Sequence, residues 1–264
     1  MWNFNLEGHT ITLSGRKLRI EEQLTEVLDL ELGERSVLLK ARNLEKNVVS
    51  LIRMRYQLDP RGFELISEDD KKKVLHIAEQ EFLYECEAIQ LLGDAGLGPK
   101  YADHLICYQP DWMPFPGGYG HFLVMTVPPG DNLDEISDEL TNRQLDSIRT
   151  QLARILELLR KNSHKLVDQH PSYLNYDVRT NKLYLVDLTH LRETDPTAAT
   201  SFPIDEESPY VEAFNLWRAP YRKPETGSRG GGSQAPRSDT SAGNRKAPSS
   251  DQLTKKENRP PWRH

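Results

Sequence analysis

Two aspartates, Asp168 and Asp187, lie nineteen residues apart in the segment VDQHPSYLNYDVRTNKLYLVDL, which covers 167–188. Asp168 begins a polar stretch that contains Pro171, whereas Asp187 directly follows the apolar residues LYLV at 183–186. In phosphoryl transfer, one carboxylate on a loop orients the attacking hydroxyl and a second carboxylate holds Mg²⁺. An aspartate on a loop and another at the end of a strand are therefore typical of a phosphoryl-transfer site.

Other interpretations of these aspartates are weaker. Three histidines, His164, His170 and His190, lie near them in the sequence and raise the alternative of a transition-metal site. However, no His or Cys pair has the spacing of a zinc site, and the Gly-Xaa-Ser-Xaa-Gly elbow of a hydrolase is missing. Aspartate is also common in ordinary turns, but the spacing and the apolar strand favour a functional role.

The chain has 264 residues, of which 37% are hydrophobic and 28% charged, and its formal net charge is −6. This composition suits a globular protein with a disordered part. Residues 222–264 hold ten lysines and arginines against four acidic residues, so this segment carries +6 and the preceding residues carry −12. An acidic body argues against a nucleic-acid-binding domain, so only the basic tail is expected to contact nucleic acid, if anything does.

No apolar run approaches the roughly 20 residues that a membrane helix needs, and the N-terminal residues lack the pattern of a secretory signal. We therefore expect no membrane partner. The two cysteines, Cys86 and Cys107, lie in apolar contexts and are expected to be buried thiols. A reducing compartment, the cytoplasm or the nucleus, follows as the expected location.

Apolar periodicity predicts the elements that must position the two aspartates. Alternating residues predict strands at 10–13, 27–32, 37–39, 48–55, 105–108 and 122–127. A helix is predicted from a cap at Ser67 to the glycines at 93–98. The segment Val127-Pro128-Pro129-Gly130 predicts a hinge, and a second helix begins at Thr141, whose capping-box partner is Gln144.

This order of strands, helix, strand pair, hinge, helix, polar loop and two-strand turn resembles the protein-kinase-like fold. The resemblance covers 27–189 and extends faintly to 220. It implies an α+β, two-lobe fold, with a five-stranded antiparallel N-terminal lobe over 1–129 and a hinge near 125–130. A small, truncated helical C-terminal lobe is implied over 130–221, and the Gly/Ser/Pro-rich tail at 222–264 is predicted to be disordered.

The resemblance also assigns roles to single residues. Asp168 falls at the catalytic-loop aspartate that accepts the proton of the attacking hydroxyl, and Asp187 falls at the aspartate that binds Mg²⁺. Glu85 falls at the helix glutamate that pairs with a strand lysine. The fifth residue after Asp168 is Tyr173, where the family has asparagine, and Asn175 would reach a metal only after a local rearrangement.

The strand lysine itself has two candidate positions. In one register Lys40 contacts the phosphates. In the other, which fits the strand count and the distance to Glu85 better, the third strand is 48–55, Ile52 takes the lysine position and Arg53 faces the opposite way. The nucleotide loop at 33–36 then has one glycine instead of three, and a loop poor in glycine approaches phosphates less readily.

Two functions are consistent with this pattern. The favoured one is a degenerate, pseudokinase-like protein that acts by binding a protein partner and binds ATP and Mg²⁺ weakly or not at all. The alternative is an active, divergent phosphotransferase in which Asp168 is the base, Asp187 holds Mg²⁺, and Lys40 or Arg53 contacts the phosphates beside Glu85. A third possibility is an interaction domain whose aspartates are coincidental.

Overall fold

The computed structural model describes residues 3–62 and 68–217, and these residues belong to one compact unit, Met1–Ala219. The predicted tail at 222–264 and the predicted helix cap at Ser67 lie outside the described residues. None of the described helices is long and apolar enough to cross a membrane.

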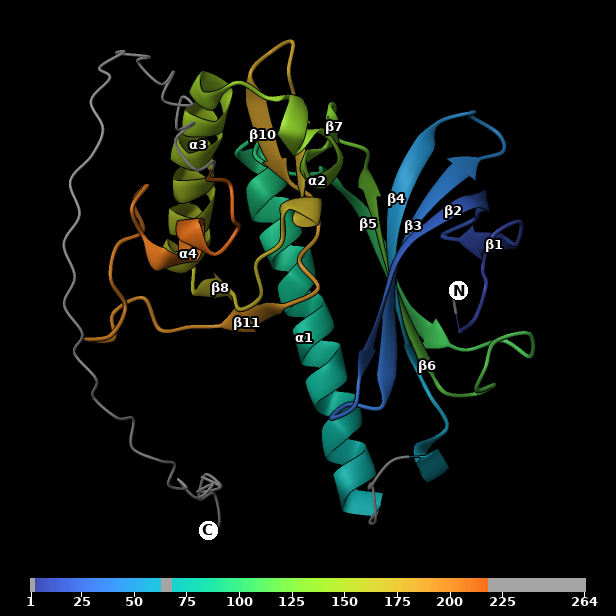
Figure 1. Ribbon diagram of the computed structural model, residues 1–264. Helices are drawn as coiled ribbons and strands as arrows, with labels where there is room; N and C mark the ends of the chain where they lie inside the picture. The colour runs from blue at the N-terminus through green and yellow to red at the C-terminus, as the bar shows by residue number, and fades with distance from the viewer. Residues whose placement is uncertain (1–2, 63–67, 218–264) are drawn as a thin grey trace, which may run out of the picture. The chain divides into compact units, whose positions relative to one another are not determined.

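The N-terminal half is an antiparallel sheet of six strands in the order β1-β2-β3-β4-β6-β5 (Figure 1). The strands are β1 (Thr10–Leu13), β2 (Arg16–Asp29), β3 (Glu34–Asn43), β4 (Val49–Gln57), β5 (Tyr101–Tyr108) and β6 (Tyr119–Thr126). The expected antiparallel sheet is confirmed. The expected number of five strands is wrong, because β1 pairs along β2 as a sixth strand.

The turn between β2 and β3 differs from the expected strand over 27–32. β2 ends at Asp29, whose carboxylate Oδ1 accepts the backbone N–H groups of Glu31 at 2.9 Å and Leu32 at 3.0 Å. These two hydrogen bonds satisfy backbone N–H groups that would otherwise donate to an adjacent strand. The chain therefore turns after Asp29 instead of continuing as a strand. Gly33, with φ +60°, completes the turn in a conformation that glycine adopts without strain.

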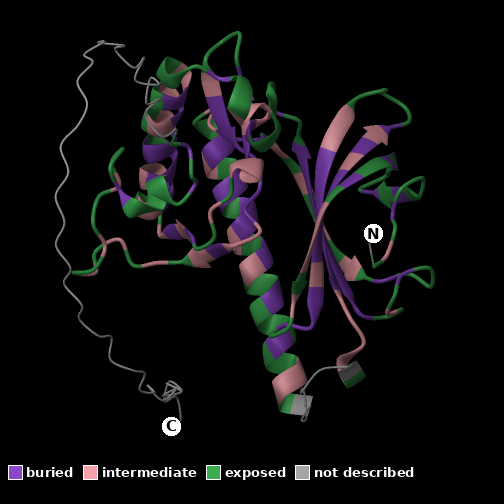
Figure 2. Ribbon diagram, in the orientation of Figure 1, coloured by how far each residue is buried: buried purple, intermediate pink, exposed green. Residues whose placement is uncertain are grey.

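The helix α1 (Glu68–Asp94) packs on one face of the sheet, next to β5 and β6 (Figure 1). Successive side chains of a strand point to opposite faces, and β4 shows this clearly. Leu51 belongs to the core that includes Phe82 and Ile89 of α1, whereas Ile52 and Met54 belong to a separate core on the other face. Figure 2 shows the resulting buried stripe along α1 and the sheet.

The C-terminal half combines one long helix and several short ones with short strand pairs. Its elements are β7 (Asp131–Asn132), α2 (Leu133–Ile136), η2 (Ser137–Glu139), α3 (Asn142–Lys161), β8 (His164–Leu166), η3 (Pro171–Tyr173), β9 (Leu174–Asp177), β10 (Lys182–Leu185), β11 (Leu191–Glu193) and α4 (Pro209–Glu212). The predicted capping box between Thr141 and Gln144 is confirmed at the start of α3. The α+β fold class is therefore confirmed.

The predicted hinge ends at a glycine that no other residue can replace without strain. Gly130 has φ +93°, and a Cβ atom there would lie 2.4 Å from the backbone carbon of Tyr176 in β9. Only glycine permits this close approach. The hinge segment is thereby held against the strand pair β9–β10, whose chain continues directly to Asp187.

Candidate functional site

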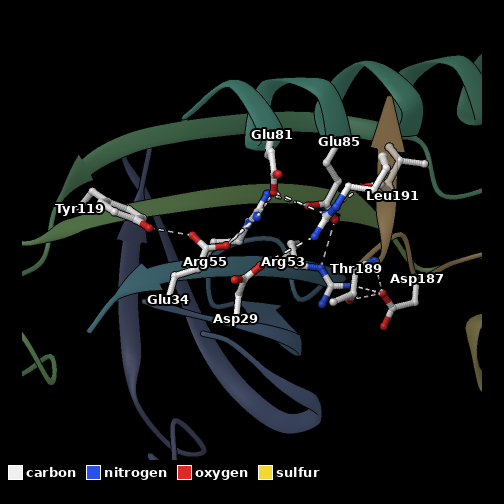
Figure 3. A network of polar contacts seen from close by, with 11 residues as sticks. Asp29, Glu34, Arg53, Arg55, Glu81, Glu85, Tyr119, Asp187, Thr189 and Leu191 are labelled. Atoms are coloured by element: carbon white, nitrogen blue, oxygen red, sulfur yellow. Dashed lines mark hydrogen bonds and ion pairs between the residues drawn. The ribbon is translucent and has the colours of Figure 1, made fainter. Parts of the chain in front are cut away.

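Arg53 of β4 lies at the centre of a buried ion-pair cluster between the sheet, α1 and the chain after β10 (Figure 3). Its Nε donates to Glu85 Oε1 at 3.2 Å, and its Nη2 donates to Asp187 Oδ1. The side chain of Arg53 is fully buried, and those of its two partners are at most 5% exposed. The fold thus brings together three of the residues named from the sequence.

The prediction of which β4 residue lies opposite Glu85 is wrong by one position. Leu51, Arg53 and Arg55 point towards α1, so Arg53, not Ile52, faces Glu85. The prediction that Arg53 faces away from Glu85 is therefore wrong. Lys40 lies elsewhere, on the surface of β3, where its Nζ is 3.6 Å from Glu22 Oε2 of β2 and 41% of its side chain is exposed.

A second buried arginine extends the cluster towards the β2–β3 turn. Arg55 Nε donates to Glu34 Oε1 at 2.7 Å, and its Nη2 donates to Glu81 Oε2 at 3.2 Å. The hydroxyl of Tyr119 donates to the other oxygen of Glu34 at 2.9 Å. Sequence analysis missed Arg55, Glu34 and Tyr119. Two arginines spaced two residues apart in a mostly apolar strand were the available signal, because such residues share one face.

The cluster holds more carboxylates than guanidinium groups. Arg53 and Arg55 face four acidic residues, which are Glu34, Glu81, Glu85 and Asp187. Burial raises the pKa of both Glu34 and Glu85 above the usual carboxyl value, although the arginines oppose that shift. Arg53 Nη1 is buried without a partner among the described residues. Burying these charged groups therefore carries a large desolvation free energy, which the ion pairs within the cluster offset.

Asp168, the expected catalytic base, lies on an exposed loop after β8, with 58% of its side chain exposed. Its Oδ2 accepts a hydrogen bond of 2.8 Å from the hydroxyl of Tyr173 and lies 3.6 Å from His190 Nε2. Burial, together with this bond to Asp168, raises the pKa of Tyr173, so the hydroxyl stays a donor. The hydroxyl of Tyr173 therefore already donates to one oxygen of the Asp168 carboxylate.

The same tyrosine brings the two aspartates into one neighbourhood. The backbone carbonyl of Tyr173 accepts the N–H of Val186 at 2.8 Å and the N–H of Asp187 at 3.3 Å. Asp187 Oδ1 also accepts from the backbone N–H of Thr189 at 2.8 Å and from its hydroxyl. The loop of Asp168 and the end of the strand before Asp187 are thus joined as the sequence spacing predicts.

Asn175 is built into a sheet instead of a metal site. It lies in β9, opposite Asn132 of β7 on one side and Tyr184 of β10 on the other. The rearrangement that would bring Asn175 to a metal at Asp187 would break this pairing. Its assignment as a cofactor-binding residue stays a prediction that the geometry does not favour.

The arrangement of side chains fits Mg²⁺ and ATP poorly. A metal ion on Asp187 Oδ1 would share that oxygen with the guanidinium of Arg53, and two cations there would repel each other. A cavity of about 210 Å³ lies beneath the β2–β3 turn and is lined by Asp29, Glu34, Arg55 and Arg192 among others. This cavity is smaller than usual ligand pockets. The charges of its two arginines and two carboxylates cancel, whereas a triphosphate needs a net positive charge.

The remaining candidates do not form a metal site. Among residues 3–62 and 68–217, no three His, Cys, Asp or Glu side chains are placed to hold a metal ion. His164 is buried in β8 with its ring 4.2 Å from that of Tyr84, and His170 caps η3. Both cysteines are free thiols, as predicted; Cys86 is buried, whereas Cys107 is only half-buried.

The order of strands and helices agrees with the protein-kinase-like fold expected from the sequence. No protein-family model and no curated protein sequence matches the chain. Among solved structures, vaccinia related kinase 3 is 16% identical with a TM-score of 0.42, over 74% of this chain and 55% of that one. The Cydia pomonella granulovirus kinase PK-1 is also 16% identical with a TM-score of 0.42, over 67% and 52%. The chain thus spans about half the length of these two kinases.

Proposed function

We propose that this chain is a kinase-like protein that does not transfer phosphate and that acts by binding other proteins. The observation that carries this proposal is the pair of hydrogen bonds from Arg53 to Glu85 and Asp187. In a kinase the corresponding glutamate orients a lysine towards phosphates and the aspartate holds Mg²⁺. Here one internal guanidinium binds an oxygen of each carboxylate, so both groups already pair with a cation of the protein itself.

The second aspartate supports the same proposal. A general base must lie within hydrogen-bonding reach of the proton that it removes. Asp168 Oδ2 is engaged by Tyr173, and the residue that would help to hold a metal in the family is replaced by this tyrosine. The two free thiols fit a reducing compartment, and we propose the cytoplasm or the nucleus.

One observation favours the alternative of an active, divergent phosphotransferase. Asp168 remains largely exposed and lies in the same neighbourhood as Asp187, with Tyr173 between them. A substrate hydroxyl that displaced the Tyr173 hydroxyl would reach Asp168. This route also requires Arg53 to release Asp187 for Mg²⁺, which would leave a buried guanidinium with fewer partners.

Thermal unfolding with and without ATP and Mg²⁺ separates the two functions. A ligand that binds only the native state raises its free energy of unfolding, by about 2.7 kcal/mol at one hundred times its Kd. We expect no change in Tm at millimolar ATP with Mg²⁺. A rise in Tm that Asp187→Asn abolishes, while Lys40→Met does not, would instead establish nucleotide binding at Asp187 and support the phosphotransferase alternative.

A further inference from the structure

A groove with a volume of about 530 Å³ lies between α1 and β11, next to the buried cluster but outside it. One wall is the exposed side of α1 and the other is the strand that follows Asp187. Its lining residues are Ile77, Gln80, Glu81, Tyr84, Leu191, Arg192 and Glu193. The postulated chemistry at Asp168 and Asp187 does not use this groove.

The helix contributes an apolar surface to the groove. Ile77 is 43% exposed, although the same helix buries Val74 and Ala78 almost completely. Ile77 and Tyr84 are seven residues apart, which places them on one face of α1 about two turns from each other. An exposed isoleucine beside a half-buried tyrosine offers a contact site for an apolar side chain.

The groove also carries unbalanced negative charge. Within the described part of the chain, no cation lies at ion-pair distance from Glu193 of the groove, nor from Glu87, an exposed residue of α1 outside the groove lining. Burial raises the pKa of Tyr84 to about 12, and the carboxylates of Glu193 and Glu87 add to this rise. Arg192, the cation in the groove, is already bound to Glu81 at 3.5 Å and to Asp29 at 3.8 Å.

The walls of the groove are held in place by the buried cluster. Glu81 Oε2 accepts a hydrogen bond from Arg55 on the sheet (Figure 3). The same carboxylate pairs with Arg192 of β11. The contact of Arg192 with Asp29 ties β11 to the β2–β3 turn as well. Because a pre-organised surface loses little entropy on binding, such a groove suits the capture of a flexible segment.

We propose that this groove binds a segment of a partner protein in which an apolar side chain lies beside a lysine or arginine. The apolar side chain packs on Ile77 and Tyr84, and the cation pairs with Glu193. This inference rests on the proposed function, because it names the surface through which a non-catalytic kinase-like protein binds its partner.

The test is a selection of random peptides displayed on phage against the full chain, followed by fluorescence anisotropy of the enriched peptides. We expect enriched sequences to combine lysine or arginine with a large apolar residue. Their affinity should fall at least tenfold in Ile77→Glu and in Glu193→Arg, and it should fall with added salt. Leu83→Glu, at an exposed residue of α1 outside the groove, is the matched control and should bind as the unmodified chain does.

A result that contradicts peptide binding in the groove differs from a result that contradicts the proposed function. Peptides that are acidic, that bind Ile77→Glu unchanged, or that are not enriched at all would overturn the groove and leave the nucleotide result untouched. Stabilisation by ATP with Mg²⁺ that Asp187→Asn abolishes would count against the proposed function and leave the peptide result untouched. Thermal unfolding of Ile77→Glu and Glu193→Arg confirms that each variant is folded before its binding is scored.

Discussion

Asp187 and Asp168 belong to the same short sequence segment, but one side chain is buried and the other is exposed. The side chain of Asp187 is 4% exposed and is bound by a fully buried arginine from a strand 134 residues away in sequence. The side chain of Asp168 is 58% exposed and is bound by a tyrosine only five residues away. One aspartate is part of the contact between the two halves of the fold, and the other makes a local contact on a loop.

This difference in burial determines what each contact is worth. A buried carboxylate that loses its cation keeps its desolvation penalty, whereas an exposed carboxylate that loses a partner is solvated again. The contact at Asp187 should therefore stabilise the whole fold, and the contact at Asp168 should only set local geometry. Substitutions that remove one partner at a time test this ranking.

The largest expected effect is that of Arg53→Met, which leaves Glu85 and Asp187 buried without their shared cation. We expect the free energy of unfolding in urea to fall by about 3–5 kcal/mol. Lys40→Met is the matched control, because Lys40 pairs with Glu22 on the surface and its removal should cost less than about 1 kcal/mol. Equal losses in the two variants would contradict the ranking.

A smaller effect is expected from His121 of β6, which lies next to the buried cluster. Its ring stacks between those of Tyr119 and Phe82, each 4.8 Å away between centroids. Burial, with a contribution from Arg55, lowers the pKa of His121 to about 4. The unfolded chain binds a proton near pH 6.5 and the native state does not, so stability is lost as the pH falls from about 6.5 to about 4.

His121→Phe should keep the stacking and remove this loss of stability in acid. We expect the variant to be up to about 3 kcal/mol more stable than the unmodified chain at pH 4.5, relative to their difference at pH 7.5. Urea unfolding at the two pH values measures this quantity. Protonation of Glu34, whose raised pKa acts in the opposite direction, is common to both chains and cancels in the comparison. Parallel pH profiles would show that His121 does not titrate between the native and unfolded states.

The sequence predicted local features well and the partners of charged groups poorly. The capping box at Thr141 and the strand before Asp187 follow from short-range rules, and the structure confirms both. The face to which Arg53 points depends on where β4 begins relative to α1, and a shift of one residue reverses it. The sequence therefore named Arg53 and Glu85 but placed Ile52 at the position that Arg53 takes.

The smallest expected effect is that of Tyr173→Phe, which removes the hydroxyl bound to Asp168 and keeps the ring. Because Asp168 is exposed, water replaces the lost donor, and we expect urea unfolding to show a loss of about 0.5–1 kcal/mol. The Tm should still not respond to ATP with Mg²⁺, since Arg53 continues to bind Asp187. A loss as large as that of Arg53→Met would show that the loop of Asp168 is part of the stable core. A Tm that responds to ATP only in Tyr173→Phe would show that the tyrosine, not the buried arginine, blocks the site.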